Sequence, residues 1–181
     1  MLLNSRFNNF SFQFPPNWFN ADIRTRYEPF FRRLPIPFTN LANFMSYTVQ
    51  SVSWPSIDAQ IAEQDLGNDY RVFKGGFDAQ KYLNKEIIIT FRTVEGYLNY
   101  FVMLDAWEQY WKLESEDTFV PNFTLRLLDN YGFQIMSVNY YNIVYKTLSE
   151  LEISYASNVP EFRTFSCTFN CARVELKRQL D

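Results

Sequence analysis

Two cysteines are the side chains in this sequence with the greatest chemical reactivity. Cys167 and Cys171 lie four residues apart, and the chain contains no other cysteine. This spacing suits two metal ligands on a helix, but the alternating residues around them predict a strand, on which they would lie about 13 Å apart. That separation is too long for a disulfide bond or a shared metal ion. We interpret both as small, reduced core residues.

The other residue types offer no catalytic pattern. Histidine is absent, which removes the commonest general base and the commonest metal ligand. The acidic segment Ser56–Asp69 lacks the ligand spacing and fixed glycine of a calcium loop, and the glycine pair at 75–76 lacks the motif of a phosphate-binding loop. We therefore predict a protein that is not an enzyme and has no catalytic residue, cofactor or metal. Three glutamates have no neighbours that would push their pKa values apart: Glu150, Glu152 and Glu161.

Charge and composition exclude further classes. The 181 residues are 47% hydrophobic, which suits one compact domain with a substantial core. The formal net charge of -3 argues against a protein that binds nucleic acid through phosphate contacts. Residues 1–40 carry five arginines against two acidic residues, so the remainder of the chain is the acidic part. No membrane-spanning run or signal pattern is present, and we expect a soluble protein made in the cytoplasm.

Residues 1–40 differ from the rest of the sequence. Five of the eight prolines fall here, and proline favours extended backbone, so we predict an extended arm without a helix or central strand across most of its length. A disordered tail is poor in aromatic residues, whereas this arm is rich in them. It should therefore lie either across its own body or across a neighbouring subunit. The candidate arm contacts are Phe12, Phe14, Trp18, Phe30 and Phe31.

A strand pattern passes directly into a helix pattern between Lys85 and Lys112. Residues 86–92 are rich in β-branched side chains and predict a strand. Thr93 is a candidate N-cap for a helix of about seventeen residues. Apolar residues then recur at the spacing of one helix face, which predicts a stripe buried against a β-sheet. The stripe consists of Tyr97, Phe101, Leu104, Trp107 and Trp111.

The segment before this strand predicts two further elements. Phe44–Trp54 has strand character and is ended by Pro55. The acidic segment Ser56–Asp69 is either a long loop or a β-ribbon that protrudes from the body. Tyr70–Phe73 then returns to a strand pattern.

The second half of the chain is predicted to be β-structure. A hairpin joins the alternating residues of Phe123–Leu127 to a return strand through the turn Asp129–Gly132, and residues 165–171 alternate in a last long strand. The predicted strands and helices do not alternate as they do in a βαβ fold. We predict a mainly β fold, an antiparallel sandwich or barrel of about six to eight strands with one principal helix. The extended arm occupies residues 1–40 and the β domain residues 41–181.

The order of these elements resembles the tail tube proteins of contractile bacteriophages and the related ring proteins of type VI secretion tubes. The resemblance covers about residues 40–176 and lies in the order of the elements and in a few short sequence segments. The parts that carry it are Val49–Pro55, Ile87–Lys112, Leu125–Phe133 and Phe162–Asn170.

The resemblance implies a structural virion protein. Such proteins form hexameric rings that stack into a tube inside the tail sheath, and DNA passes through the lumen without specific binding. A negative body suits that passage, because it repels the phosphates. The arm resembles the decorated rings near a baseplate, which gives a baseplate or tube-initiator ring as the alternative. The resemblance places the ring-to-ring contact on the loop after the first strand, with Asp58, Ile61, Glu63, Asp65 and Leu66 as candidates.

A third interpretation comes from a different class of protein. A β-barrel could hold an apolar small molecule against Tyr97, Phe101 and Trp107. The tube interpretation predicts rings or filaments for the purified protein, whereas the barrel interpretation predicts a stable monomer.

Overall fold

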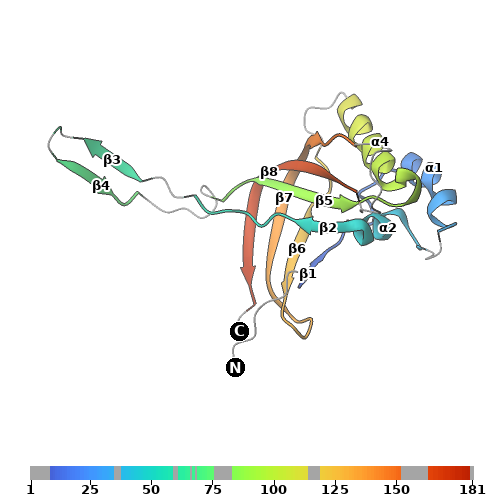
Figure 1. Ribbon diagram of the computed structural model, residues 1–181, viewed down its shortest axis with the longest axis horizontal. Coiled ribbons are helices and arrows are strands. Elements are labelled where there is room, and N and C mark those ends of the chain that lie inside the picture. Colours follow the sequence, from blue (N-terminus) through green and yellow to red (C-terminus); the bar gives the residue numbers. More distant parts are fainter. Residues whose placement is uncertain are drawn as a thin grey trace, which may run out of the picture.

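The computed structural model describes residues 9–34, 38–58, 61–65, 67, 69–75, 83–113, 119–151 and 163–179. Within them the chain forms a six-stranded antiparallel sheet, a separate two-stranded hairpin and three α-helices (Figure 1). The mainly antiparallel β fold with one principal helix, predicted from the sequence, is confirmed. The strands are β1 (Phe10–Phe12), β2 (Val49–Val52), β3 (Ala62–Asp65), β4 (Tyr70–Phe73), β5 (Glu86–Arg92), β6 (Phe123–Leu128), β7 (Gln134–Leu148) and β8 (Thr164–Arg178). The helices are α1 (Ala21–Phe31), α2 (Leu41–Thr48) and α4 (Leu98–Lys112), and a 3₁₀ turn, Glu95–Tyr97, precedes α4.

The six-stranded sheet has the order β1-β6-β7-β8-β5-β2 and is nearly closed. The two fifteen-residue strands, β7 and β8, pair at its centre, and the two shortest strands, β1 and β2, end it. β5 lies beside β8 with Ile89 opposite Cys167 and Phe91 opposite Phe165. Its inward side chains are fully buried, as the β-branched alternation predicts.

The turn between β6 and β7 is the one that the sequence predicts. The Asp129 carboxylate accepts hydrogen bonds from the backbone N–H groups of Tyr131 and Phe133, each at 2.8 Å. Gly132 has φ +89°, a conformation that favours glycine because it has no Cβ. An aspartate that satisfies two backbone donors and a glycine with positive φ together fix this hairpin.

Aromatic side chains fill the space between the sheet and the helices, which Figure 1 shows gathered on one side of the sheet. The ring of Phe169 on β8 lies 4.9 Å from that of Tyr145, 5.7 Å from that of Trp18 and 5.8 Å from that of Phe123, between centroids. Cys167 and Cys171 are buried beside it as free thiols, and the prediction of small core residues is confirmed.

The prediction of an extended arm is wrong for Ala21–Phe31, because these residues form α1. Asn20 is the N-cap of this helix, and its side-chain oxygen accepts from the Ile23 N–H at 2.9 Å. Only Ile23 and Phe31 of the helix are buried, so the apolar period was too sparse to indicate a helix. Pro29 lies in its last turn, where the loss of one backbone hydrogen bond affects little of the helix.

The predicted strand Phe44–Trp54 is wrong in its first half. Residues up to Thr48 belong to α2, and only Val49–Val52 form a strand. Asn40 caps α2 by accepting from the Asn43 N–H at 2.7 Å. Buried positions recur at a helical spacing: Leu41, Ala42, Phe44, Met45 and Thr48.

The face that α4 turns inward also differs from the prediction. The stripe residues Phe101 and Trp111 are 44% and 52% exposed, and Tyr97, Leu104 and Trp107 are half-buried. The buried residues of α4 are Asn99, Val102, Met103 and Ala106. Two tyrosines outside the predicted stripe also pack on the sheet, because the ring of Tyr100 lies 5.2 Å from that of Phe165 and the ring of Tyr110 lies 5.3 Å from that of Tyr145.

The start of this helix is displaced as well. Gly96 and Tyr97 have positive φ, so regular helix begins only at Leu98. Thr93 is not the N-cap, and its hydroxyl donates to the Arg163 carbonyl at 2.8 Å. Buried Asn99 holds the strand-to-helix connection instead, because its amide donates to the Arg92 carbonyl at 2.8 Å and accepts from the Val94 N–H at 3.2 Å.

Candidate interaction surfaces

The described residues contain no group of three or more histidine, cysteine, aspartate or glutamate side chains that could hold a metal ion. Burial raises the pKa of the Cys167 thiol and raises that of Cys171 to about 11. Both thiols are therefore protonated at neutral pH, and neither is an activated nucleophile. The surfaces that remain as candidate functional sites are apolar or aromatic patches.

The hairpin β3–β4 is the most isolated part of the structure. Figure 1 shows it projecting from the side of the sheet opposite the helices. Its stem continues β2 and β5, through a bridge between Ile57 and Leu83 and a 2.8 Å hydrogen bond from the Asn84 N–H to the Ser56 carbonyl. The acidic segment is thus partly a protruding β-ribbon, one of the two predicted alternatives.

Every side chain of the two hairpin strands is exposed. Glu63 lies opposite Val72, and Asp65 lies opposite Tyr70. The Glu63 carboxylate accepts a hydrogen bond from Tyr70 and raises the pKa of that phenol. An isolated two-stranded hairpin is only marginally stable in water, so strand pairing alone gives this ribbon little stability.

Four of the five residues predicted for the ring-to-ring contact lie on or beside this ribbon. Glu63 and Asp65 are exposed on β3, Ile61 is exposed just before it, and Asp58 is exposed near the stem. Leu66 lies outside the described residues. The contact itself stays a prediction.

Phe101 and Trp111, the exposed members of the predicted stripe, form a second apolar surface on α4, whereas Trp107 packs against the core. Trp107 and Trp111 lie 6.1 Å apart, centroid to centroid. No helix in the described part of the chain, α4 included, is long and apolar enough to cross a membrane.

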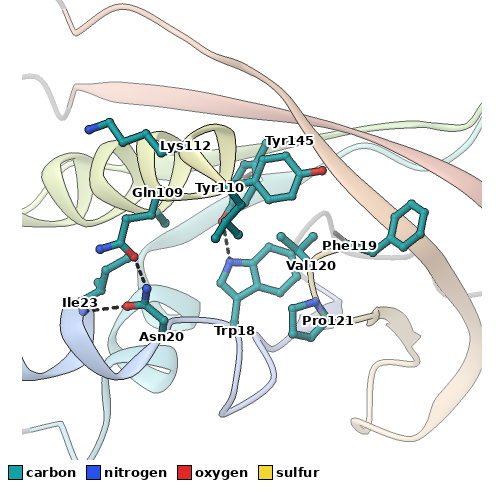
Figure 2. Close-up of a pocket in the computed structure, with 12 residues that line it drawn as sticks. Trp18, Asn20, Ile23, Gln109, Tyr110, Lys112, Phe119, Val120, Pro121 and Tyr145 are labelled. Atoms are coloured by element: carbon teal, nitrogen blue, oxygen red, sulfur yellow. Dashed lines mark hydrogen bonds between the residues drawn. The ribbon is translucent and has the colours of Figure 1, made fainter. Parts of the chain in front are cut away.

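A pocket of about 310 Å³ opens beneath the end of α4 (Figure 2). Trp18 and Tyr145 lie deep in it, and the indole N–H of Trp18 donates to the Tyr145 hydroxyl at 2.9 Å. Burial raises the pKa of Tyr145 well above its usual value. The rim carries the paired amides of Asn20 and Gln109 and exposed apolar side chains at Leu113 and Phe119. Lys112 also borders the pocket, but its ammonium points away from the cavity and pairs with Glu108 (Figure 2). We call this site the α4 pocket.

The turn between β6 and β7 carries a third aromatic surface. Tyr131 is 81% exposed and Phe133 is 72% exposed, more than any other large apolar side chain in the described residues. We call residues Asp129–Phe133 the β6–β7 tip. Sequence reasoning identified the turn but not its exposure, although two aromatic residues flanking the glycine of a tight turn were a visible signal.

A groove of about 760 Å³ separates the two strands that end the sheet. Phe10 and Val52 line it from β1 and β2, and Leu125 and Leu127 line it from β6. Within the part of the chain that the structure describes, the sheet is open along this line, and β1 and β2 each have a strand neighbour on one side only. Neither cavity described here is lined by Tyr97, Phe101 or Trp107, the residues that the small-molecule interpretation required.

The predicted arm contacts lie mostly in the protein's own core. Phe12, Phe14, Trp18 and Phe31 are buried, whereas Phe30 is 54% exposed. α1 is also tied to α4 by polar contacts, because Arg26 and Tyr27 both reach the Asp105 carboxylate, at 2.6 Å and 2.8 Å. Partial burial and the Asp105 hydrogen bond raise the pKa of Tyr27 to about 12. Residues 9–34 are therefore an integral part of the folded body.

Comparison with known proteins gives structural likeness only. No protein-family model and no curated protein matches the sequence. A chain in the cryo-EM structure of the anti-feeding prophage baseplate, 6-fold symmetrised, has a TM-score of 0.59 and 11% identity and covers 100% of both chains. A chain in the anti-feeding prophage tube-terminating cap covers 72% of this chain and 80% of its own, with a TM-score of 0.48 and 16% identity.

A third similar chain comes from the sheath-tube complex of an extracellular contractile injection system, PVC, in its extended state. It covers 72% of this chain and 80% of its own length, with a TM-score of 0.46 and 19% identity. The fold is thus that of the baseplate chain over its whole length. At the level of the fold, the resemblance predicted from the sequence is confirmed, because the anti-feeding prophage baseplate chain shares the fold over the full length of both chains.

Proposed function

We propose that the protein is a structural, non-enzymatic subunit that forms six-membered rings in the tube of a contractile tail or injection system. The observation that carries this proposal is the likeness over the full length of both chains to a subunit of a 6-fold symmetrised baseplate. The rings would stack within a tail sheath, and DNA or other cargo would pass through the lumen without specific binding. The protein would then be located in the tail of a virion or injection particle.

The exposed surfaces support an assembled state. The hairpin β3–β4 has no buried side chain of its own, and among the described residues β1 and β2 each leave one edge without a strand neighbour. Exposed strand edges invite pairing with other chains. Identical neighbours in a closed ring would cover them. We assign the hairpin to the contact with the adjacent ring, as the resemblance to tail tube proteins implies.

A ring at the baseplate end of the tube is the second candidate. Two observations favour it. The full-length match is to a baseplate chain, and it includes the segment 9–34 that packs into the core. The two candidates differ in one measurable property, because a repeating tube subunit stacks on further copies of itself, whereas a single baseplate ring does not.

Particle mass and shape test the proposal. We expect mass photometry of the purified chain to find a species of about 130 kDa, six times the 21.7 kDa of one chain. Negative-stain microscopy should show rings with a central hole. A chain that stays at 21.7 kDa up to high micromolar concentration, with a small apolar molecule bound in a central cavity, would overturn the proposal in favour of the ligand-binding barrel.

A further inference from the structure

We propose that copies of this chain also join head to tail, with the β6–β7 tip of one copy inserted into the α4 pocket of the next. This inference rests on the proposed function, because it names the surfaces through which successive rings would stack. It concerns two regions that the hairpin contact does not use. The inserted residues are Tyr131 and Phe133.

The tip has the properties of a preformed anchor. Its two aromatic side chains are the most exposed large apolar groups in the described residues, so they lose the most apolar contact with water on burial. The backbone beneath them is held by the two hydrogen bonds to Asp129. A rigid aromatic anchor loses little conformational entropy when it binds, which is typical of residues that dominate an interface.

The α4 pocket has the matching form. Its floor is buried and largely apolar, built from Trp18, Ile23, Ala106 and Val120. Its volume of about 310 Å³ suits an aromatic side chain rather than a large cofactor. Exposed Leu113 and Phe119 extend the apolar surface beyond the mouth, as Figure 2 shows for Phe119. A second copy would cover both the cavity and this rim.

The tip and the pocket lie at opposite ends of the same strand. β7 begins at Gln134, directly after the tip, and Tyr145, which lines the pocket, is eleven residues further along. At about 3.3 Å per residue, this separation is roughly 35 Å, so the two cannot meet within one chain. A copy shifted along the strand direction brings them together, and such a heterologous contact repeats without closing, as stacking requires.

Charged and polar groups beside the two surfaces are complementary. The tip carries the Asp129 carboxylate, and Lys112 borders the pocket with its ammonium turned away from the cavity in this structure (Figure 2). Lys112 pairs with Glu108 at 2.8 Å on the helix surface, and such exposed pairs contribute little stability, so the ammonium is free to reorient. The side-chain amides of Asn20 and Gln109 at the rim also carry N–H groups, which can donate hydrogen bonds to a carboxylate.

Cysteine cross-linking tests the contact directly. Two variants, Asn130→Cys at the tip and Leu113→Cys at the pocket rim, keep both aromatic anchors. The native thiols are buried and will not compete. Under mild oxidation we expect an equimolar mixture to give a covalent dimer of about 43 kDa, twice 21.7 kDa, at several times the yield of either variant alone.

In the matched control, the Leu113→Cys variant is mixed with a Tyr47→Cys variant instead of the tip variant. Tyr47 lies on α2, and its side chain is 55% exposed. The proposal requires that Leu113→Cys cross-links with the tip variant far more than with the α2 variant. Equal yields from the two mixtures would overturn it. This outcome does not depend on whether rings form, so it judges the contact separately from the proposed function.

A second experiment separates stacking from ring formation. The double variant Tyr131→Ser, Phe133→Ser should fold normally, because both side chains are exposed, and an unchanged circular dichroism spectrum would verify this. We expect its rings to persist at about 130 kDa, six times 21.7 kDa, while stacks seen by negative stain become about tenfold rarer. The control Tyr47→Ser should leave stacking unchanged. Stacks of normal length in the double variant would overturn the inference and leave the ring intact.

Discussion

The body of the protein and the hairpin β3–β4 are both antiparallel β-structure, yet they are stabilised in different ways. In the body, strands pair and also bury large aromatic side chains against helices, so that Phe169 contacts three other rings. In the hairpin, strands pair but every side chain remains exposed. Strand pairing alone gives little net stability, because unfolded backbone bonds equally to water. The body is therefore held by its own side-chain packing, whereas the hairpin is the part for which we propose a partner.

The largest effect on the body is expected for Phe169→Ala. Removing this fully buried ring leaves a cavity among Trp18, Phe123 and Tyr145, and we expect the free energy of unfolding to fall by about 3–5 kcal/mol. Urea denaturation measures it. The matched control is Phe133→Ala, which removes the same side chain from an exposed site and should cost less than about 0.5 kcal/mol. Equal losses would contradict the assignment of the core.

A smaller loss is expected for Asn99→Ala. The variant removes two hydrogen bonds, one to the Arg92 carbonyl and one from the Val94 N–H, and each contributes about 0.5–1.5 kcal/mol, so we expect a loss of about 1–3 kcal/mol. Thermal or urea unfolding gives the value. Asn130→Ala, in the exposed turn, serves as the control. A loss no greater than that of the control would show that Asn99 does not hold the strand-to-helix connection.

Asn20→Ala tests whether the segment before residue 34 is part of the body. Loss of the N-cap of α1 should lower the free energy of unfolding by about 1 kcal/mol. Asn20→Ser keeps an accepting oxygen and should recover most of it. Because Asn20 also donates to Gln109, the variant Gln109→Ala separates the cap from that contact. No change in Asn20→Ala would mean that α1 adds nothing to the stability of the body.

The smallest effect on folding is expected in the hairpin. The double variant Tyr70→Ser, Val72→Ser should change the free energy of unfolding by less than about 0.5 kcal/mol, since both side chains are exposed. Its self-association should nevertheless weaken by about tenfold, measured by sedimentation velocity. Gln64→Ser, on the opposite face of the hairpin, is the control. A hairpin variant that destabilises the fold but associates normally would reverse the comparison.

Local sequence signals predicted the elements that depend on local chemistry. β5 was predicted from Glu86 to Arg92 because of its β-branched residues, and the turn Asp129–Gly132 because of its aspartate and glycine. The same signals failed for α2, where a short run of apolar and small polar residues fits either a strand or a helix. They also failed for α1, which has only two buried side chains and a proline in its last turn.

The candidate surfaces were less predictable than the fold. Apolar spacing predicted a helix that ends at Lys112, but it placed the start before Leu98 and assigned the aromatic stripe to the core, because aromatic side chains are usually buried. Phe101 and Trp111 are instead exposed, while Val102, Met103 and Ala106 face the sheet. The α4 pocket joins residues from both halves of the chain, such as Trp18 and Tyr145, and no local pattern links them.

The sequence by itself determined the antiparallel β class, the central strands, the tight turn and the buried thiols, because these follow from the period of apolar residues and from backbone preferences. Only the tertiary structure decided which helix face is buried, that residues 9–34 complete the core, and where aromatic side chains remain exposed. Burial depends on which distant residues already fill the space, and that competition is settled only when the whole chain has packed.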